Sequence, residues 1–186
     1  STEKKIQKKV DYVAQKYSHI DILVNNAGIT RRNEVEIFKQ KDWKDVLQVN
    51  LNAPFYLSKA VSKYFIKQKS GKIINIASIL SYQGGVRVPS YVTSKHGIVG
   101  LTRSYAVGLG KYGINVNAIA PGFMETDMTK PLHDDEKRNK EILDGVPLQR
   151  WGQPEDLKGA VVYLSSSLSD FVNGEVLLID GGWLIR

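Results

Sequence analysis

The sequence predicts an α/β fold built on a doubly wound parallel sheet. Short apolar runs rich in β-branched residues recur along the chain, and each of them ends in turn-forming residues. Amphipathic helical patterns separate these runs, and strands that alternate with helices are typical of a parallel sheet covered by helices. A length of 186 residues suits a single domain with a sizeable core.

The patterns place each element in order. The predicted strands are residues 21–28 (DILVNNAG), 71–78 (GKIINIAS), 114–122 (INVNAIAPG) and 174–182 (GEVLLIDGG). The predicted helices are residues 2–17, 42–67, 90–111 and 155–167. Residues 123–150 carry no strong pattern, and long loops of this kind in α/β enzymes often act as lids over a site.

Composition argues against several classes of function. The net charge is +7, but the lysines of the first helical pattern lie opposite Ile6, Val10 and Val13, as on the solvated side of an amphipathic helix. No nucleic-acid-binding motif accompanies the charge, so no nucleic-acid partner is predicted. The sequence shows no cysteine, no apolar run long enough to span a bilayer and no secretory signal. We expect a cytoplasmic protein without a membrane partner or a metal site.

The carboxyl ends of the predicted strands are polar, small or flexible, as in NNAG, ASILS and APGFMET. In open parallel sheets, ligands bind outside these ends, where the strand order reverses. Packing does not require two adjacent asparagines, Asn25 and Asn26, at a strand end. A binding site is therefore predicted at this edge of the sheet.

Tyr91 and Lys95 lie one helical turn apart, and Ser78 precedes Tyr91 by thirteen residues. Taken alone, such a pair is common on the surface of a helix. A phenol with a pKa of about 10 is a poor acid or base at neutral pH, but an ammonium group within about 6 Å favours the phenolate and lowers that pKa. Placed beside a binding site, the pair would indicate acid–base chemistry.

Seven motifs follow one another at fixed distances: Asn25-Asn26-Ala27-Gly28, Asn50, Ser78, Tyr91 with Lys95, Pro121-Gly122, Thr126 and Asp180-Gly181-Gly182. In this order the chain resembles the short-chain dehydrogenases/reductases along its whole length. The resemblance implies a Rossmann sheet and hydride transfer between a nicotinamide cofactor and a hydroxyl or ketone group.

The resemblance also implies a role for each matched residue. Tyr91 would be the general acid/base, Lys95 would tune it and bind the nicotinamide ribose, and Ser78 would donate a hydrogen bond to the reacting oxygen. Asn50 would position a water molecule for proton relay. The cofactor, NAD or NADP with NAD favoured, would contact Asn25, Ala27, Gly28, Tyr91, Lys95, Pro121, Gly122, Met124 and Thr126.

Three arginines, Arg31, Arg32 and Arg87, border the predicted site. Guanidinium groups suit bidentate carboxylate binding, so an anionic substrate such as a six-carbon sugar acid is predicted, with Arg87 as its preferred partner. Pairing with acids such as Glu34 is the alternative for each arginine. The segments SYQGGVRVPSY, RWGQPEDL and DGGWLIR resemble family members that act on 2-dehydro-3-deoxy-D-gluconate, whereas APGFMETDMTKPLHDDE resembles those that act on gluconate.

The chain departs from the family at its start, because no glycine precedes Gly28 and the Gly-rich turn for the cofactor pyrophosphate is missing. The resemblance implies that two βα units and a third strand, about 60 residues, are absent. Residues 1–186 would then form the carboxyl-terminal three quarters of a single dinucleotide-binding catalytic domain. An inactive truncated fragment is the alternative. A homotetramer is expected by resemblance, and because helices 42–67 and 90–111 are apolar on more than one side.

Overall fold

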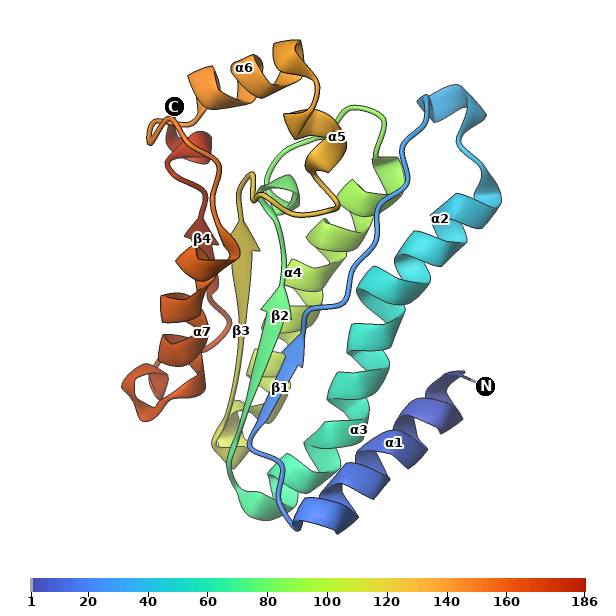
Figure 1. The fold of residues 1–186 in the computed structure, drawn as a ribbon. Helices are drawn as coiled ribbons and strands as arrows, with labels where there is room; N and C mark the ends of the chain where they lie inside the picture. The colour runs from blue at the N-terminus through green and yellow to red at the C-terminus, as the bar shows by residue number, and fades with distance from the viewer. Residues whose placement is uncertain (1) are drawn as a thin grey trace.

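A computed structural model describes residues 2–186 and contains one sheet of four parallel strands in the order β1-β2-β3-β4 (Figure 1). The strands are β1 (Ile22–Asn25), β2 (Gly71–Ile76), β3 (Ile114–Pro121) and β4 (Val176–Ile179). The prediction of a parallel α/β sheet is confirmed. Each strand is shorter than predicted, because the residues that follow its carboxyl end leave the sheet and turn toward the candidate site.

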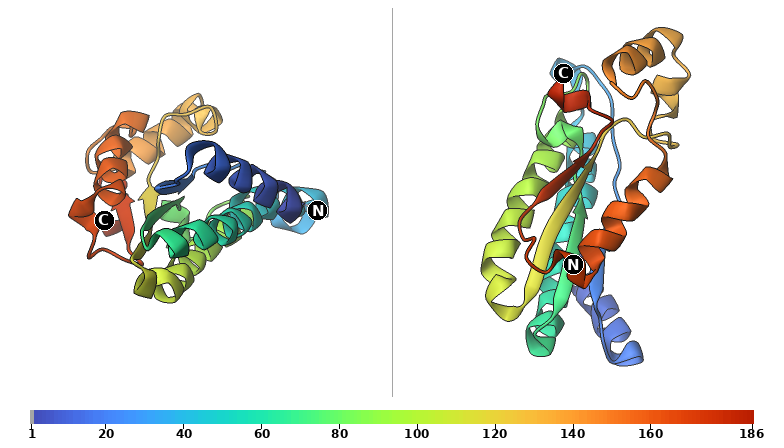
Figure 2. Two further views of the ribbon diagram at one scale, coloured as in Figure 1. Left: turned by 90° about the horizontal axis from the view of Figure 1, so that it is seen from below. Right: turned by 90° about the vertical axis from the view of Figure 1, so that its left-hand side faces the viewer.

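Helices cover the sheet on both faces (Figure 2). The helices are α1 (Thr2–Tyr17), α2 (Gln40–Leu47), α3 (Ala53–Gln68), α4 (Pro89–Leu109), α5 (Lys130–His133), α6 (Glu136–Gly145) and α7 (Lys158–Ser165). Helices α3 and α4 lie on one face and α7 on the other, while α5 and α6 lie beyond the carboxyl ends of the strands (Figures 1 and 2). Helix α1 packs along α3, where Lys59 pairs with Glu3 and Tyr64 donates to Asp11.

Two adjacent residues of β2 show how the layers are held together. Successive side chains of a strand point to opposite faces. Ile73 packs with Phe65 of α3 and Ala106 of α4, whereas Ile74 packs with Leu164 of α7. Both isoleucines are 1% exposed, so β2 is buried on both faces as expected for a strand inside a parallel sheet.

The predicted helix over residues 42–67 is interrupted. Helices α2 and α3 are joined by a π-helical turn, Gln48–Asn52, and Asn50 at its centre is buried. Single π-turns inside helices are rare and often mark functional sites. Periodicity does not reveal this feature, because the apolar pattern continues through it.

Residues 123–150 are not the patternless loop that the sequence indicated, since they contain α5 and α6. The side chain of Asp135 caps α6 by accepting a hydrogen bond from the main-chain nitrogen of Arg138 at 3.0 Å. Ile142, Val146 and Trp151 form a small core beneath α6. The helical pattern was missed because α6 contributes few apolar residues to this core.

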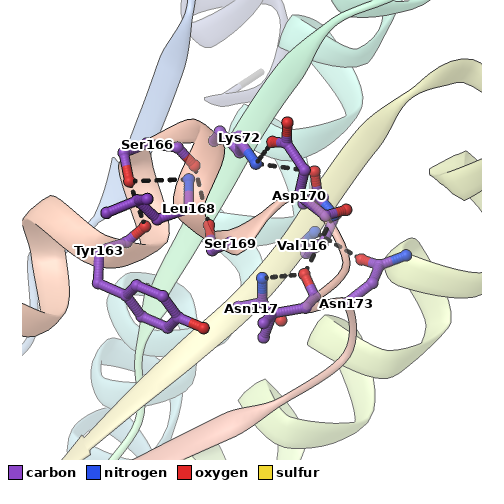
Figure 3. A network of polar contacts seen from close by, with 11 residues as sticks. Lys72, Val116, Asn117, Tyr163, Ser166, Leu168, Ser169, Asp170 and Asn173 are labelled. Atoms are coloured by element: carbon purple, nitrogen blue, oxygen red, sulfur yellow. Dashed lines mark hydrogen bonds and ion pairs between the residues drawn. The ribbon is translucent and has the colours of Figure 1, made fainter.

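The loop between α7 and β4 forms hydrogen bonds and an ion pair with residues of β2 and β3 (Figure 3). Lys72 pairs with Asp170 at 2.7 Å, and Asn117 donates to the carbonyl of Val172. The main-chain nitrogen of Val116 donates to Asn173 Oδ1 at 2.8 Å. These contacts fix the point at which the chain enters β4.

Strand β1 forms an edge of the sheet, and its side chains Ile22 and Val24 are 41% and 42% exposed. Exposed apolar residues on an edge strand are unusual unless another element covers them.

Across residues 2–186, no helix combines the length and apolar character needed to cross a membrane.

Candidate active site

A cavity of about 420 Å³ opens at the carboxyl ends of the strands, between the start of α4 and the α5–α6 segment. Its wall includes both Ser78 and Tyr91, together with Phe123 and Trp183. Thr129, Leu132 and Arg138 contribute from the segment that the sequence predicted to be a lid. The structure thus brings Ser78 and Tyr91 into one cavity with residues that are distant from them in the sequence.

Tyr91 is the third residue of α4, which begins at Pro89, and this places its side chain in the first helical turn. Ser78 leaves β2 at its end and caps a short 3₁₀ turn by accepting from the nitrogen of Leu80 at 3.1 Å. Burial raises the pKa of the Tyr91 phenol. Opposing this, a hydrogen bond with Ser78 and then the positive charge of Arg32 lower that pKa.

Lys95 was predicted to lower the pKa of Tyr91, but Arg32 is the cation with this effect in the structure. The Lys95 Nζ atom donates to the carbonyl of Ile76 at 2.6 Å and lies 5.5 Å from the centroid of the Tyr91 ring. Lys95 is 4% exposed, and burial lowers the pKa of its ammonium group to about 8. Arg32 is thus a cation that the sequence did not indicate for Tyr91, and the tuning of Tyr91 by Lys95 stays a prediction.

The side chain of Asn50 fastens the segment after β1 to the middle of the fold. Its Oδ1 accepts from the nitrogen of Ile29 at 2.9 Å, and its Nδ2 donates to the carbonyl of Ile29 and to Ser94 Oγ. Gly28 is next to this anchor, since a Cβ there would lie 3.6 Å from Asn50 Oδ1 and 3.9 Å from Lys95 Nζ. Because the Asn50 amide is fully engaged, the predicted water position would have to depend on its main chain.

Asn25 is buried in the sheet, whereas Ala27 is exposed beyond the end of β1. Asn25 Nδ2 donates to Asn75 Oδ1 at 2.8 Å, and Asn75 in turn donates to Thr102. The Oδ1 atom of Asn25 has no hydrogen-bond partner among the described residues. Buried carbonyl oxygens normally have a partner, so this oxygen is an exception among the buried polar atoms of the sheet.

The segment after β3 turns closely over the end of β4. The nitrogen of Gly122 donates to the carbonyl of Ile179, the residue that pairs with Pro121, and a Cβ at Gly122 would lie 2.6 Å from the Cα of Asp180. Of the other predicted cofactor contacts, Met124 is buried against Gly152, and Thr126 Oγ1 lies 3.1 Å from Thr129 Oγ1.

The three predicted arginines separate into two groups. Arg31 is directed away from the cavity, with its Nε atom 3.7 Å from Asp42 of α2. Arg32 and Arg87 both line the cavity. Arg87 pairs through Nε with Glu34 at 3.0 Å, as the alternative interpretation proposed, and its main chain has a left-handed φ of 66°.

Arg138 and Trp183 are among the cavity residues that were not predicted as site residues. Arg138 lies on α6, and Trp183 follows the Asp180-Gly181-Gly182 turn. Asp180 holds this turn by accepting from the nitrogens of Gly182 and Leu184, each at 2.9 Å. Trp183 could have been predicted as a site residue because it directly follows the motif at 180–182. No local sequence pattern indicated that Arg138 lines the cavity.

The lining residues determine which groups the site can hold. The described residues that line the cavity include three arginines but no aspartate or glutamate. No cluster of His, Asp or Glu within residues 2–186 could hold a metal ion. Lys95 Nζ and Gly28 lie next to each other beside Asn50, and an ammonium group beside a residue without a side chain suits a hydroxyl-bearing ligand.

A serine, a tyrosine and a lysine at the carboxyl ends of a parallel sheet define an oxidoreductase of the Rossmann type. Residues 1–184 match the family described as Enoyl-(Acyl carrier protein) reductase. The chain belongs to the short-chain dehydrogenase/reductase family, as the motifs predicted.

Similar proteins act on sugar acids according to their names. The chain is 54% identical over 178 residues to the 2-dehydro-3-deoxy-D-gluconate 5-dehydrogenase of Escherichia coli and 52% identical over 178 residues to that of Dickeya dadantii. These matches cover 95% of the chain and 70% of each relative. A crystal structure of a gluconate 5-dehydrogenase from Burkholderia cenocepacia in complex with NADP and tartrate has a TM-score of 0.96 at 37% identity. That match covers 97% of this chain and 71% of the other.

Proposed function

We propose that the protein interconverts a hydroxyl and a ketone on a six-carbon sugar acid, using a nicotinamide cofactor, with 2-dehydro-3-deoxy-D-gluconate as its substrate. The observation that carries the proposal is the placement of Ser78 and Tyr91 in a cavity that three arginines line without a carboxylate. Such a cavity suits an organic anion whose reacting oxygen lies at the tyrosine. The names of the Escherichia coli and Dickeya dadantii relatives support this substrate.

In the direction of reduction, the Tyr91 phenol donates a proton to the ketone oxygen while Ser78 holds that oxygen by a hydrogen bond. The raised pKa of Tyr91 keeps the phenol protonated at neutral pH, as a proton donor requires. In the direction of oxidation, the phenolate accepts the proton of the hydroxyl. The nicotinamide cofactor, when bound, supplies or accepts the hydride.

Lys95 and Gly28 are proposed to contact the nicotinamide ribose, because both lie beside Asn50 below the end of β1. Asn25, Ala27, Pro121, Gly122, Met124 and Thr126 remain proposed cofactor contacts. The Burkholderia cenocepacia relative was crystallised with NADP, so the preference for NAD that the sequence suggested receives no support from the similar structures. We therefore propose a nicotinamide dinucleotide and leave open whether its adenosine ribose carries the 2′-phosphate of NADP or the 2′-hydroxyl of NAD.

Gluconate is the second candidate substrate, and the Burkholderia cenocepacia gluconate 5-dehydrogenase favours it. Gluconate and 2-dehydro-3-deoxy-D-gluconate both carry a carboxylate at one end of a six-carbon chain. They differ in the oxidation state at the second carbon and in one hydroxyl. The arginines recognise the feature that the two substrates share, so they do not decide between them.

We further propose that residues 1–186 are the carboxyl-terminal three quarters of one dinucleotide-binding domain, that the enzyme is cytoplasmic, and that it forms homotetramers through α3 and α4. The coverage of 70% of each relative and the exposed Ile22 and Val24 on β1 support the proposal that this chain is part of a larger domain.

Phe55 on α3 and Val107 on α4 are 39% and 86% exposed, which supports a homotetramer interface on these helices. A stable monomer in light scattering of the full-length enzyme would contradict the tetramer.

Steady-state assays of the full-length enzyme test the proposed reaction. In the direction of oxidation, each sugar acid is supplied with NAD or with NADP. In the direction of reduction, the oxidised product of each acid is supplied with the reduced cofactor. The rate is followed by the absorbance of the reduced nicotinamide. We expect the highest kcat/KM on 2-dehydro-3-deoxy-D-gluconate. Turnover of gluconate alone would move the assignment to the second candidate, and turnover of neither acid would refute the sugar-acid proposal.

A further inference from the structure

The charges around the cavity are unequally neutralised. Arg87 is paired with Glu34 and Arg138 with Glu141, whereas Arg32 has no acidic partner among the described residues. The positive charges of Arg138 and Arg87 lower the pKa of the Arg32 guanidinium, after burial as the first cause. The three cations are therefore close enough to repel one another, and an anion placed between them would relieve that repulsion.

Arg138 differs from the other two cations in its position. It lies in the first turn of α6, on the segment that covers the cavity, while Arg32 and Arg87 come from loops at its rim. Helix α6 is held in place by Ile142, which is fully buried, and by Asn139, which accepts from the indole nitrogen of Trp151 at 2.7 Å. This anchored helix brings the Arg138 guanidinium to the wall of the cavity, close enough to Arg32 for the two charges to interact.

Exchanging Glu141 for another partner of Arg138 would cost the protein little stability. The ion pair with Glu141 joins one guanidinium nitrogen to one carboxylate oxygen at 2.8 Å, between residues three apart on the same helix. The two side chains are 42% and 47% exposed, and exposed pairs of this kind contribute little to stability. A substrate carboxylate inside the cavity could form a bidentate and less solvated pair with the same guanidinium.

We propose that Arg138 is a specificity-determining residue that exchanges its ion pair with Glu141 for the carboxylate of the substrate, with Arg32 as a second cation near that carboxylate. This inference rests on the proposed sugar-acid function and names the residue on α6 through which substrate charge is recognised. Arg87 has a separate partner in Glu34, and its main-chain carbonyl accepts from the nitrogen of Asn33 at 3.0 Å, which holds the two rim loops together.

Binding without turnover tests the exchange directly. Trp183 lines the cavity, so its fluorescence in the full-length enzyme can be titrated with D-gluconate and with D-glucitol, which has a hydroxymethyl group in place of the carboxylate. We expect Arg138→Gln to weaken gluconate binding by about tenfold or more, the loss of one hydrogen bond to a charged group, and to leave glucitol binding unchanged. Glu141→Gln should strengthen gluconate binding, since it frees Arg138.

Lys140→Gln is the matched control, because Lys140 lies on the same helix, pairs with Asp144 and does not line the cavity. It should leave the affinity for gluconate unchanged. Equal weakening of gluconate and glucitol by Arg138→Gln would show that Arg138 only supports α6, and unchanged gluconate binding would also refute its role. If Arg138→Gln fails to fold, Glu141→Gln decides, because an unaltered or weaker affinity for gluconate then contradicts the exchange.

The kinetics separate this inference from the proposed function. A wild-type enzyme that turns over a sugar acid, with the same KM in Arg138→Gln, would contradict the role of Arg138 and leave the proposed function intact. A wild-type enzyme that binds gluconate and glucitol equally well and turns over neither sugar acid would contradict both.

Discussion

Lys95 donates a hydrogen bond of 2.6 Å to the carbonyl of Ile76, where β2 ends. This contact joins the second turn of α4 to the sheet and holds the ammonium group 5.5 Å from the centroid of the Tyr91 ring. The arrangement leaves Arg32 as the cation that acts on the phenol from the cavity side. Arg32, which is proposed to lie near the substrate carboxylate, therefore also acts on the proposed acid–base residue.

Replacement of Tyr91 by phenylalanine should remove the proton donor while leaving the ring in place. Turnover of the full-length enzyme is expected to fall by about 10²–10⁴-fold, the range of general acid–base catalysis. Tyr82→Phe is the control, because Tyr82 donates only a weak hydrogen bond to the carbonyl of Val176 and does not line the cavity. Turnover of Tyr91→Phe within a few fold of the wild type on its best substrate would exclude the mechanism.

Arg32→Gln should change the pH dependence of the oxidation reaction. The charge of Arg32 lowers the pKa of Tyr91, so its removal should raise that pKa and shift the rising limb of kcat against pH to higher pH. The shift should be below about one pH unit, because Arg32 is only partly buried and solvent still screens its charge. Arg31→Gln is the comparison, since Arg31 faces Asp42 outside the cavity. Equal profiles for wild type and Arg32→Gln would mean that the arginine does not act on the phenol.

The elements of the fold could be predicted because their signals are local. A β-branched run marks each strand, and the spacing of Ser78, Tyr91 and Lys95 identifies the acid–base group. Adjacent arginines show the limit of such signals. Arg31 and Arg32 are equivalent in the sequence, yet one pairs with Asp42 and the other lines the cavity, because the direction of each side chain depends on the path of the loop.

Long-range features of the site could not be predicted for the same reason. Arg138 joins the cavity only because a small core of Ile142, Val146 and Trp151 folds α6 back over the strand ends. The effect of Lys95 on Tyr91 was also inferred from spacing alone, whereas the carbonyl of Ile76, nineteen residues away, determines where the ammonium lies.

The close approach of Gly122 to Asp180 predicts a stability effect. A Cβ at position 122 would lie 2.6 Å from a main-chain atom, so Gly122→Ala must displace the turn that carries Trp183. We expect a loss of about 1–3 kcal/mol in the free energy of unfolding, typical of overpacking. Gly159→Ala is the control, because Gly159 lies in α7 with no atom near the added methyl group, and it should gain about 0.5–1 kcal/mol. Urea denaturation of both variants measures the difference, and equal stabilities would contradict the packing argument.

The buried ammonium group of Lys95 makes stability depend on pH in a definite direction. Burial lowers the pKa of Lys95 to about 8 in the folded state, below its value of about 10.5 in an unfolded chain. Between these two values the unfolded state binds more protons than the folded state, so the stability contributed by this group rises with pH. Below pH 8 the burial of the charged Lys95 ammonium group lowers the stability of the folded state by its full amount, which is about 3 kcal/mol for a fully buried group.

Lys95→Met keeps the length of the side chain and removes the charge, so it should be more stable than the wild type at pH 7 even though it is inactive. The difference in the free energy of unfolding between the two proteins should shrink as pH rises from about 8 to about 10, because the wild-type lysine loses its proton in the folded state over this range. Urea denaturation at several pH values measures this difference directly, and other titrating groups cancel because both proteins share them. A difference that stays constant over this range would show that Lys95 remains charged when buried and that its bond to the carbonyl of Ile76 compensates for the lost hydration.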